Sequence, residues 1–156
     1  MKKILSLLLV LVTMLAVCTS LVACGGPKPN LDFDSAKQNL AENGYRAHVE
    51  DGEEYGGYLG EAIEQRLFAY DEDDNYIYIY EFKDSKAAKL YYEYIKEGSD
   101  AEYEFYKRYL KKYGDDLTRE EREELEDYIK ELEDWVVGRS GKYVWYGTKD
   151  AVNATK

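Results

Sequence analysis

Cysteine and histidine are scarce in this sequence, and each shortage excludes a class of site. Both cysteines, Cys18 and Cys24, lie near the amino terminus, so the rest of the chain has no thiol for a disulfide, a zinc-thiolate site or a cysteine nucleophile. His48 is the only histidine, so any serine–histidine–aspartate mechanism or histidine metal site must use it. Its position in an alternating segment predicts an exposed side chain.

Positive charge is also scarce. The chain has 21 Lys and Arg against 32 Asp and Glu, a formal net charge of −11. This excess argues against nucleic acid and anionic lipid headgroups as ligands, because both would be repelled. Cationic ligands, basic peptides and metal ions are electrostatically easier partners, although the charge also serves simply to keep a domain soluble.

The first 23 residues have the layout of a secretory signal. Lys2 and Lys3 form a short basic start, and residues 4–23 carry no charge. The run ends in Leu21-Val22-Ala23-Cys24, which resembles the lipobox of bacterial lipoproteins. The resemblance implies cleavage between Ala23 and Cys24 and a diacylglyceryl group on the Cys24 thiol. It also implies that lipid on Cys24 holds the chain at the extracytoplasmic face of a bacterial cell membrane.

Two alternatives compete with this anchor. Cys18 is a poor lipidation site, because Val17 is too large for the position before a cut. An uncleaved membrane-spanning segment is the other, since about 20 apolar residues can cross a bilayer. Four hydroxyl side chains dilute the run, and Gly25-Gly26-Pro27 follows without a basic stop-transfer cluster. The lipid anchor is therefore the preferred interpretation.

Residues 24–30 are expected to be the lipidated cysteine and a flexible tether, and residues 31–156 a single acidic domain. Loss of Lys2 and Lys3 with the signal leaves 19 basic and 32 acidic residues, a net charge of −13. Aromatic residues total 23, of which 17 are Tyr, so there are many rings to bury and disorder is excluded.

Periodicity predicts an α+β domain, in which an antiparallel sheet of about five strands has helices packed mainly on one face. The expected strands are 45–50, 64–70, 75–82, 135–137 and 143–146, with 51–60 a loop. The expected helices are 34–43, 85–97, 101–112, one opened by the capping box Thr118–Glu121, and a short last one after Thr148. Gly98-Ser99-Asp100 is expected to interrupt the middle of the chain, and the helical pair near 101–134 to be an insertion.

An aromatic stripe in the central hairpin is the candidate binding surface. Alternation places Ile77 and Ile79 on one face of a strand, toward Ala88, Tyr91 and Ile95 of the following helix. The other face would then form an exposed platform, suited to sugars, peptides or another protein. The candidate residues of this platform are Phe68, Tyr70, Tyr76, Tyr78 and Tyr80. The alternative is that the tyrosine-rich helical pair covers them.

Other motifs do not support a specific chemistry. Asp71–Asn75 resembles the start of a calcium loop, but Tyr76 and Phe82 stand where Gly and Glu are required, so a hairpin turn is expected. Gly138–Lys142 matches neither a nucleophile elbow nor a phosphate loop and is expected to be a tight turn. With so many acids, a carboxylate pair at a given spacing has no specificity.

The sequence therefore predicts a lipid-anchored extracytoplasmic binding or interaction module whose partner is a protein or a small ligand. No catalytic residue, metal site or cofactor is assigned. The alternative is a small cell-surface hydrolase that uses carboxylates and tyrosines, which would need a concave pocket holding two carboxylates with opposed pKa shifts.

Overall fold

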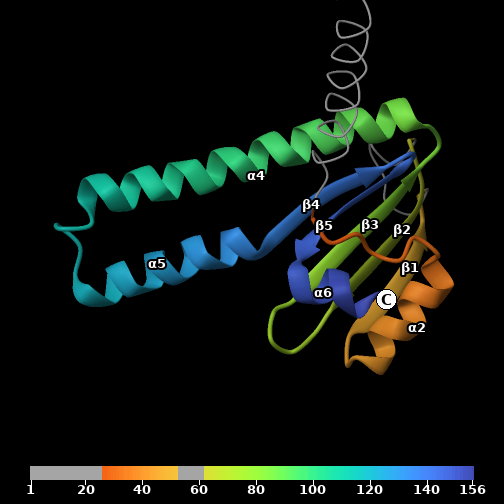
Figure 1. Cartoon of the computed structure of the whole chain (residues 1–156), viewed down its shortest axis with the longest axis horizontal. Helices are drawn as coiled ribbons and strands as arrows, with labels where there is room; N and C mark the ends of the chain where they lie inside the picture. Colours follow the sequence, from red (N-terminus) through yellow and green to blue (C-terminus); the bar gives the residue numbers. More distant parts are fainter. Residues whose placement is uncertain (1–25, 53–61) are drawn as a thin grey trace, which may run out of the picture.

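The computed structural model describes residues 26–52 and 62–156, which form a five-stranded antiparallel sheet with helices (Figure 1). The spatial order of the strands is β1-β2-β3-β5-β4. Their bounds are Arg46–Asp51 for β1, Ile63–Tyr70 for β2, Tyr76–Phe82 for β3, Trp135–Ser140 for β4 and Tyr143–Thr148 for β5. The predicted α+β class is confirmed. The expected anchor at Ala23 and Cys24 and most of the expected loop 51–60 lie outside the described residues.

One face of the sheet is aliphatic and is covered by two short helices. Ile77 and Ile79 of β3 are fully buried there, among side chains of α2 (Phe33–Glu42) and α6 (Lys149–Ala154). The expectation that these isoleucines would contact Ala88, Tyr91 and Ile95 is wrong. The first and last helices of the domain cover that face instead. The alternation of residues in a strand shows which side chains are apolar, but not which helix packs on them.

The opposite face is aromatic, and the long helix α4 (Ser85–Tyr113) crosses one end of it. Tyr80 and Phe82 of β3 are buried beneath Ala88 and Tyr91. The ring centroids of Tyr80 and Tyr91 are 5.2 Å apart in an edge-to-face arrangement. The helices are thus divided between the two faces of the sheet, and the expectation that they would pack mainly on one face is corrected.

Helix α4 is continuous over 29 residues, so the expected interruption at Gly98-Ser99-Asp100 is wrong. A glycine inside a helix costs about 1 kcal/mol relative to alanine. That cost does not stop a helix whose first turns are fixed on the sheet and whose last turns pack against α5 (Arg119–Asp134). Gly98 shows no left-handed backbone that would end the helix.

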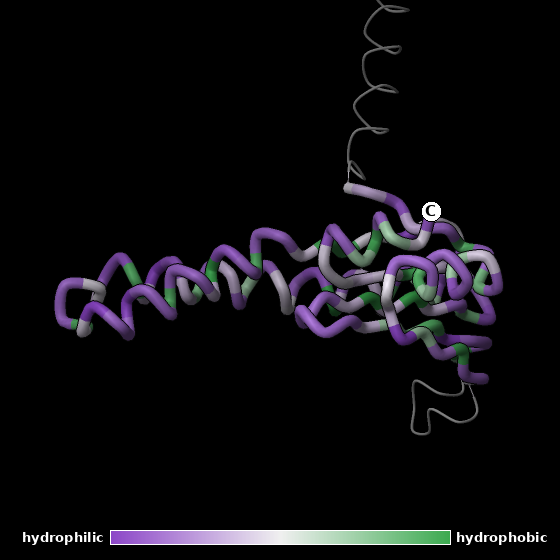
Figure 2. Tube along the Cα trace, turned by 90° about the horizontal axis from the view of Figure 1, so that it is seen from below, coloured by the Kyte–Doolittle hydropathy of each residue, from purple (hydrophilic) through white to green (hydrophobic). Residues whose placement is uncertain are grey.

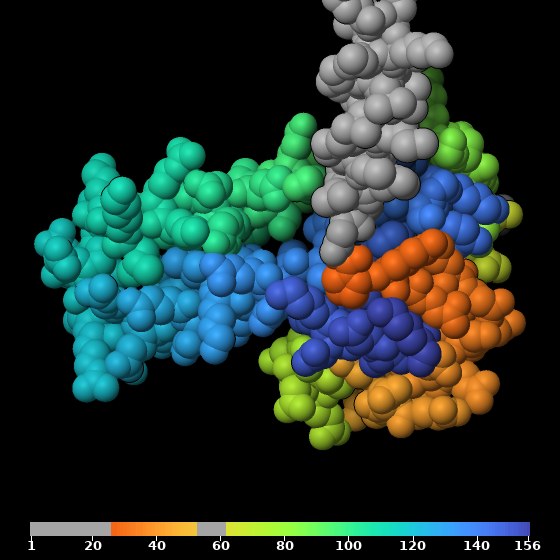
Figure 3. All heavy atoms as spheres, in the orientation of Figure 1, coloured from red at the N-terminus to blue at the C-terminus, as the bar shows by residue number. Residues whose placement is uncertain are grey.

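Beyond the sheet, α4 and α5 project from the body as an antiparallel pair (Figures 1 and 3). We call residues 98–134 the arm. Figure 2 shows that the arm is mostly hydrophilic, whereas hydrophobic positions concentrate in the body. The two helices are joined by polar and ring contacts: the Tyr103 hydroxyl donates to Glu133 at 2.6 Å and the Tyr128 hydroxyl to Glu102 at 2.7 Å. The expected helical insertion between β3 and β4 is confirmed.

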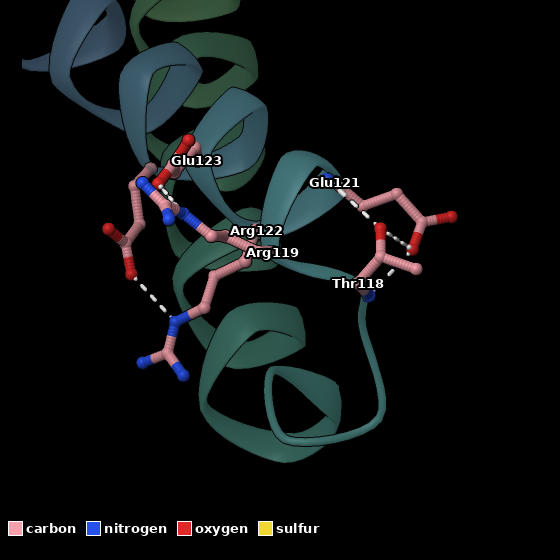
Figure 4. A network of polar contacts seen from close by, with 6 residues as sticks. Thr118, Arg119, Glu121, Arg122 and Glu123 are labelled. Carbon is pink, nitrogen blue, oxygen red and sulfur yellow. Dashed lines mark hydrogen bonds and ion pairs between the residues drawn. The ribbon is translucent and has the colours of Figure 1, made fainter.

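The predicted capping box opens α5 (Figure 4). The Glu121 backbone N–H donates to Thr118 Oγ1 at 3.3 Å, and the Thr118 N–H donates to the Glu121 carboxylate at 2.8 Å. Arg119 and Arg122 then each bind a glutamate one helical turn later. These exposed pairs contribute only about 0.3–0.5 kcal/mol each, so the cap and the contacts with α4 stabilise α5 more than its ion pairs do.

The described part of the expected tether packs against the domain. Pro29 is buried, and the Asn30 N–H donates to Thr155 Oγ1 at 2.9 Å. Figure 3 shows this segment lying against α6. Gly26 lies beside Val136, and the register places Val136 on the same face as Ile77. The chain therefore enters the domain on its aliphatic face. Among the described residues, no helix combines the length and hydrophobicity needed to cross a bilayer.

We predict that Tyr80→Ala destabilises the fold more than Tyr78→Ala. Tyr80 is fully buried under α4, whereas Tyr78 is half-buried. Removing a large buried ring costs about 3–5 kcal/mol, and a partly exposed ring costs less. Urea unfolding midpoints of the two variants, with Ile79→Ala as the reference for a core residue, measure the difference. Equal losses for Tyr78→Ala and Tyr80→Ala would show that the whole tyrosine face is core.

Candidate functional site: an aromatic groove beside the arm

The end of the tyrosine face that α4 leaves uncovered carries a group of half-buried rings. We call these rings the platform; they are Phe68, Tyr70, Tyr76, Tyr78 and Tyr146. Antiparallel register creates the group, because Phe68 and Tyr146 both stand directly opposite Tyr78 on the neighbouring strands. The ring centroids of Phe68 and Tyr78 are 4.5 Å apart, and those of Tyr78 and Tyr146 are 5.0 Å apart, both stacked.

Four of the five residues predicted for this surface lie on it, and Tyr80 does not. Tyr80 has no exposed surface, and its hydroxyl lies 3.4 Å from that of Tyr146, within hydrogen-bond distance. A buried tyrosine is tolerated where its hydroxyl has such a partner, so Tyr80 belongs to the core. Tyr146 takes its place. The sequence predicted the strand that holds Tyr146 but not that this strand pairs with β3.

The platform continues into a groove against the root of the arm. A cavity of about 330 Å³ lies over the platform, and one of about 370 Å³ lies between β3 and α5; both are lined by Asp74 and Tyr76. Trp135 forms the junction, with its ring edge-to-face on Tyr76 at 5.6 Å. Tyr128 and Leu132 of α5 line the far side. Sequence reasoning missed these three residues, because they come from α5 and the start of β4 rather than from the central hairpin.

Carboxylates dominate the polar lining of the groove. The acidic lining residues are Asp71, Asp73, Asp74, Glu131, Asp134 and Asp150. Among the described residues that line the two cavities, Lys149 is the only basic one, and its ammonium already binds Asp134 at 2.8 Å. The groove therefore combines aromatic faces with an excess of negative charge.

Two of these carboxylates are held in the charged form. Burial opposes ionisation of Asp71, but hydrogen bonds from Asn75 and from the Asp73 N–H outweigh it and lower the pKa of Asp71. The hydrogen bond from Lys149 lowers the pKa of Asp134. Asp71 also closes the hairpin turn by accepting from the Asp73 and Asn75 N–H groups, each at 2.9 Å, so the expected turn is confirmed.

The other margin of the platform is the edge strand β1. Arg46, His48 and Glu50 stand opposite Tyr70, Phe68 and Arg66, so they share the platform's face. His48 is exposed, as predicted. Arg66 binds Glu50, and its guanidinium lies over the Tyr78 ring, 5.9 Å from the centroid. The platform thus already accommodates one cation on the face of a ring.

The carboxylates of the described residues include no pair with opposed pKa shifts. Every carboxylate with a clearly shifted pKa in the described residues is shifted downward, so the opposed pair that hydrolysis would use is not found there. Within 26–52 and 62–156, no group of three or more His, Cys, Asp or Glu side chains is placed to hold a metal ion.

Tyr76 makes the groove sensitive to alkaline pH. Burial, and then the neighbouring Tyr78, Tyr128 and Glu102, raise the pKa of Tyr76 from 10.0 to about 12. Because the folded state holds this proton more tightly than the unfolded state, its contribution to stability is complete below about pH 10 and is lost as the pH rises toward about 12.

We therefore predict that Tyr76→Phe reduces the loss of stability between about pH 10 and pH 12, by at most about 2 kcal/mol. Urea unfolding across this range measures it. Tyr109→Phe, on the exposed outer side of α4, is the control and should follow the wild type. Parallel pH profiles for wild type and Tyr76→Phe would contradict the prediction.

Comparisons with protein-family models, with curated proteins and with solved structures found no match, so the interpretation of this groove is based on its own geometry and chemistry.

Proposed function

We propose that the chain is a lipid-anchored extracytoplasmic binding module that holds a basic segment of a protein partner in the aromatic groove. The observation that carries the proposal is the groove itself: stacked rings left open by α4, adjoining cavities lined by six carboxylates and by one lysine that is already paired. A lysine or arginine side chain would gain both a ring face and a carboxylate there.

The size of the groove supports a polypeptide segment as the ligand. The two cavities adjoin at Asp74 and Tyr76, and together they extend from β2 across β3 to α5. Such an elongated site accommodates several consecutive side chains. Aromatic residues also gain contact area at little entropic cost, which makes them common anchors in protein recognition.

The position of the chain's entry supports the lipid anchor. Gly26 follows Cys24 by two residues, a span of about 7 Å at most, and it lies beside Val136 on the aliphatic face of the sheet. The platform is on the opposite face. Gly26 also lines a cavity with Leu132, Trp135 and Lys149, which line the groove, so lipid on Cys24 would hold the groove close to the membrane surface. Two or more acyl chains are sufficient for stable attachment.

The anchor is tested by a pair of cysteine variants. Cys24→Ala should abolish incorporation of labelled palmitate and release the chain from the membrane fraction or leave it uncleaved. Cys18→Ala should behave like the wild type, because the match to the lipobox ends at Cys24. Wild-type chain that is membrane-bound yet carries no lipid would sink the proposed anchor.

The groove is tested with a ten-residue lysine peptide as the probe and the lipidated full-length chain in a neutral detergent. Trp135 lines the groove, so its fluorescence should change on binding, whereas Trp145 is buried on the other face. Asp74→Asn with Glu131→Gln should weaken binding about tenfold, because two carboxylates are neutralised. Asparagine also tolerates the positive φ of 60° at position 74.

The matched control removes the same charge elsewhere. Glu120→Gln with Glu124→Gln changes two exposed residues of α5 that do not line the groove. If this control weakens the peptide as much as the groove variant does, binding reflects net charge alone. A ten-residue glutamate peptide should not bind. Equal binding of both peptides would contradict the proposed preference for cations.

A further inference from the structure

The exposed large apolar side chains of the described residues lie almost entirely on α4. Leu90 is 61% exposed, Tyr94 72%, Phe105 59%, Tyr109 39% and Tyr113 40%. They follow one another at helical spacing along a single side of the helix, with Gly98 and Ala101 between them. We call the six residues from Leu90 to Tyr109 on this side the α4 stripe. It spans about 30 Å of helix, and none of its residues lines the groove.

From Leu90 to Tyr109 the α4 stripe has the same order of large and small side chains in both directions, whereas Tyr113, one turn further on, would face Lys86. Its residues are Leu90, Tyr94, Gly98, Ala101, Phe105 and Tyr109, which are two large, two small and two large side chains. An antiparallel second copy would place Leu90 opposite Tyr109, Tyr94 opposite Phe105 and Gly98 opposite Ala101. This symmetry of side-chain size is compatible with a two-fold contact, in which each pair of positions occurs twice.

Gly98 has no explanation within one chain. A Cβ added at this position would meet nothing within 4 Å, so internal packing does not require a glycine there. The helix nevertheless bears the cost of about 1 kcal/mol that an interior glycine imposes. Glycine and alanine at the centre of a stripe of large side chains allow another backbone to approach closely.

The α4 stripe is accessible to a second helix. Residues nine apart are separated by two and a half helical turns and so lie on opposite sides of a helix. Phe105 of the stripe therefore lies opposite Lys96, and Tyr94 of the stripe lies opposite Tyr103. Lys96 and Tyr103 face the region of Gly26 and Glu133 of α5. Figure 1 shows that α5 runs along one side of α4 only. A second copy would therefore displace neither the arm nor the described start of the chain.

Charge also favours a contact through α4. The helix has seven basic and five acidic residues, whereas α5 has three basic and nine acidic. The whole chain has a net charge of −11, so two copies repel each other least where α4 meets α4. From these observations we propose that the chain forms an antiparallel homodimer through the α4 stripe.

A contact between single helices is at the small end of interface sizes, so we expect a dissociation constant on the order of 10 µM. The repulsion between two acidic bodies should make the dimer tighter at higher salt. Sedimentation of the full-length chain in a neutral detergent, from about 1 to 200 µM and at two ionic strengths, measures both expectations. A monomer throughout that range would overturn the proposal.

Two double variants test whether the α4 stripe is the dimer interface. Tyr94→Ser with Phe105→Ser should weaken the dimer at least tenfold while leaving oligolysine binding unchanged, because both rings are exposed and distant from the groove. The control, Phe68→Ser with Tyr70→Ser, removes two platform rings and should keep the dimer while losing the peptide. Persistence of the dimer in the first variant, or its loss in the second, would overturn the proposal.

Cross-linking tests the antiparallel register independently of affinity. The described residues contain no cysteine, so Gly98→Cys with Ala101→Cys introduces thiols at facing positions only. Mild oxidation of membranes carrying this variant should give a covalent dimer. Glu120→Cys with Glu123→Cys, at the same spacing on the exposed side of α5, should not. A cross-link of equal yield in the control would show random collision and refute the register.

Discussion

The packing of Tyr80 and Phe82 beneath Ala88 and Tyr91 is the contact on which the rest of the molecule depends. It fixes the first turns of α4 across one end of the aromatic face, and the direction of a long, continuous helix follows from its first turns. The rest of α4 must then leave the sheet. The other end of the same face stays uncovered, so one contact produces both the arm and the platform.

The arm adds to the negative charge beside the platform. On the sheet alone the rings are bordered on one side by Arg46, His48 and the Arg66–Glu50 pair, and on the other by the acidic turn of Asp71, Asp73 and Asp74. The return of the chain along α5 brings Glu131 and Asp134 beside the acidic hairpin turn. The proposed preference for a basic segment therefore draws on the hairpin turn and on the insertion together, while the stacked rings come from the sheet.

Much of the fold could be predicted from local patterns. Alternation in β1 and β3, the capping box at Thr118 and the turn at Asp71 each depend on residues close in sequence, and each was identified correctly. The errors concern long-range partners. A helix break was predicted at Gly98, because glycine lowers helix stability by about 1 kcal/mol relative to alanine. The tertiary contacts at both ends of α4 stabilise the helix by more than this cost. Alternation placed Tyr80 on the face opposite Ile77 and Ile79, which was predicted to be exposed, but α4 covers that end of the face and the Tyr146 hydroxyl lies within hydrogen-bond distance of the Tyr80 hydroxyl.

The sequence by itself determined the α+β class, the two-faced strand β3, and most of the rings on the platform, because side-chain direction in a strand alternates whatever the strand packs against. The proposed anchor at Cys24 is based on the sequence alone, because the lipobox is a local motif. Only the tertiary structure decided which helices cover which face, that β5 adds Tyr146 beside β3, and that α5 closes the groove with Trp135 and carboxylates. Those choices depend on contacts between residues distant along the chain, and local spacing carries no information about them.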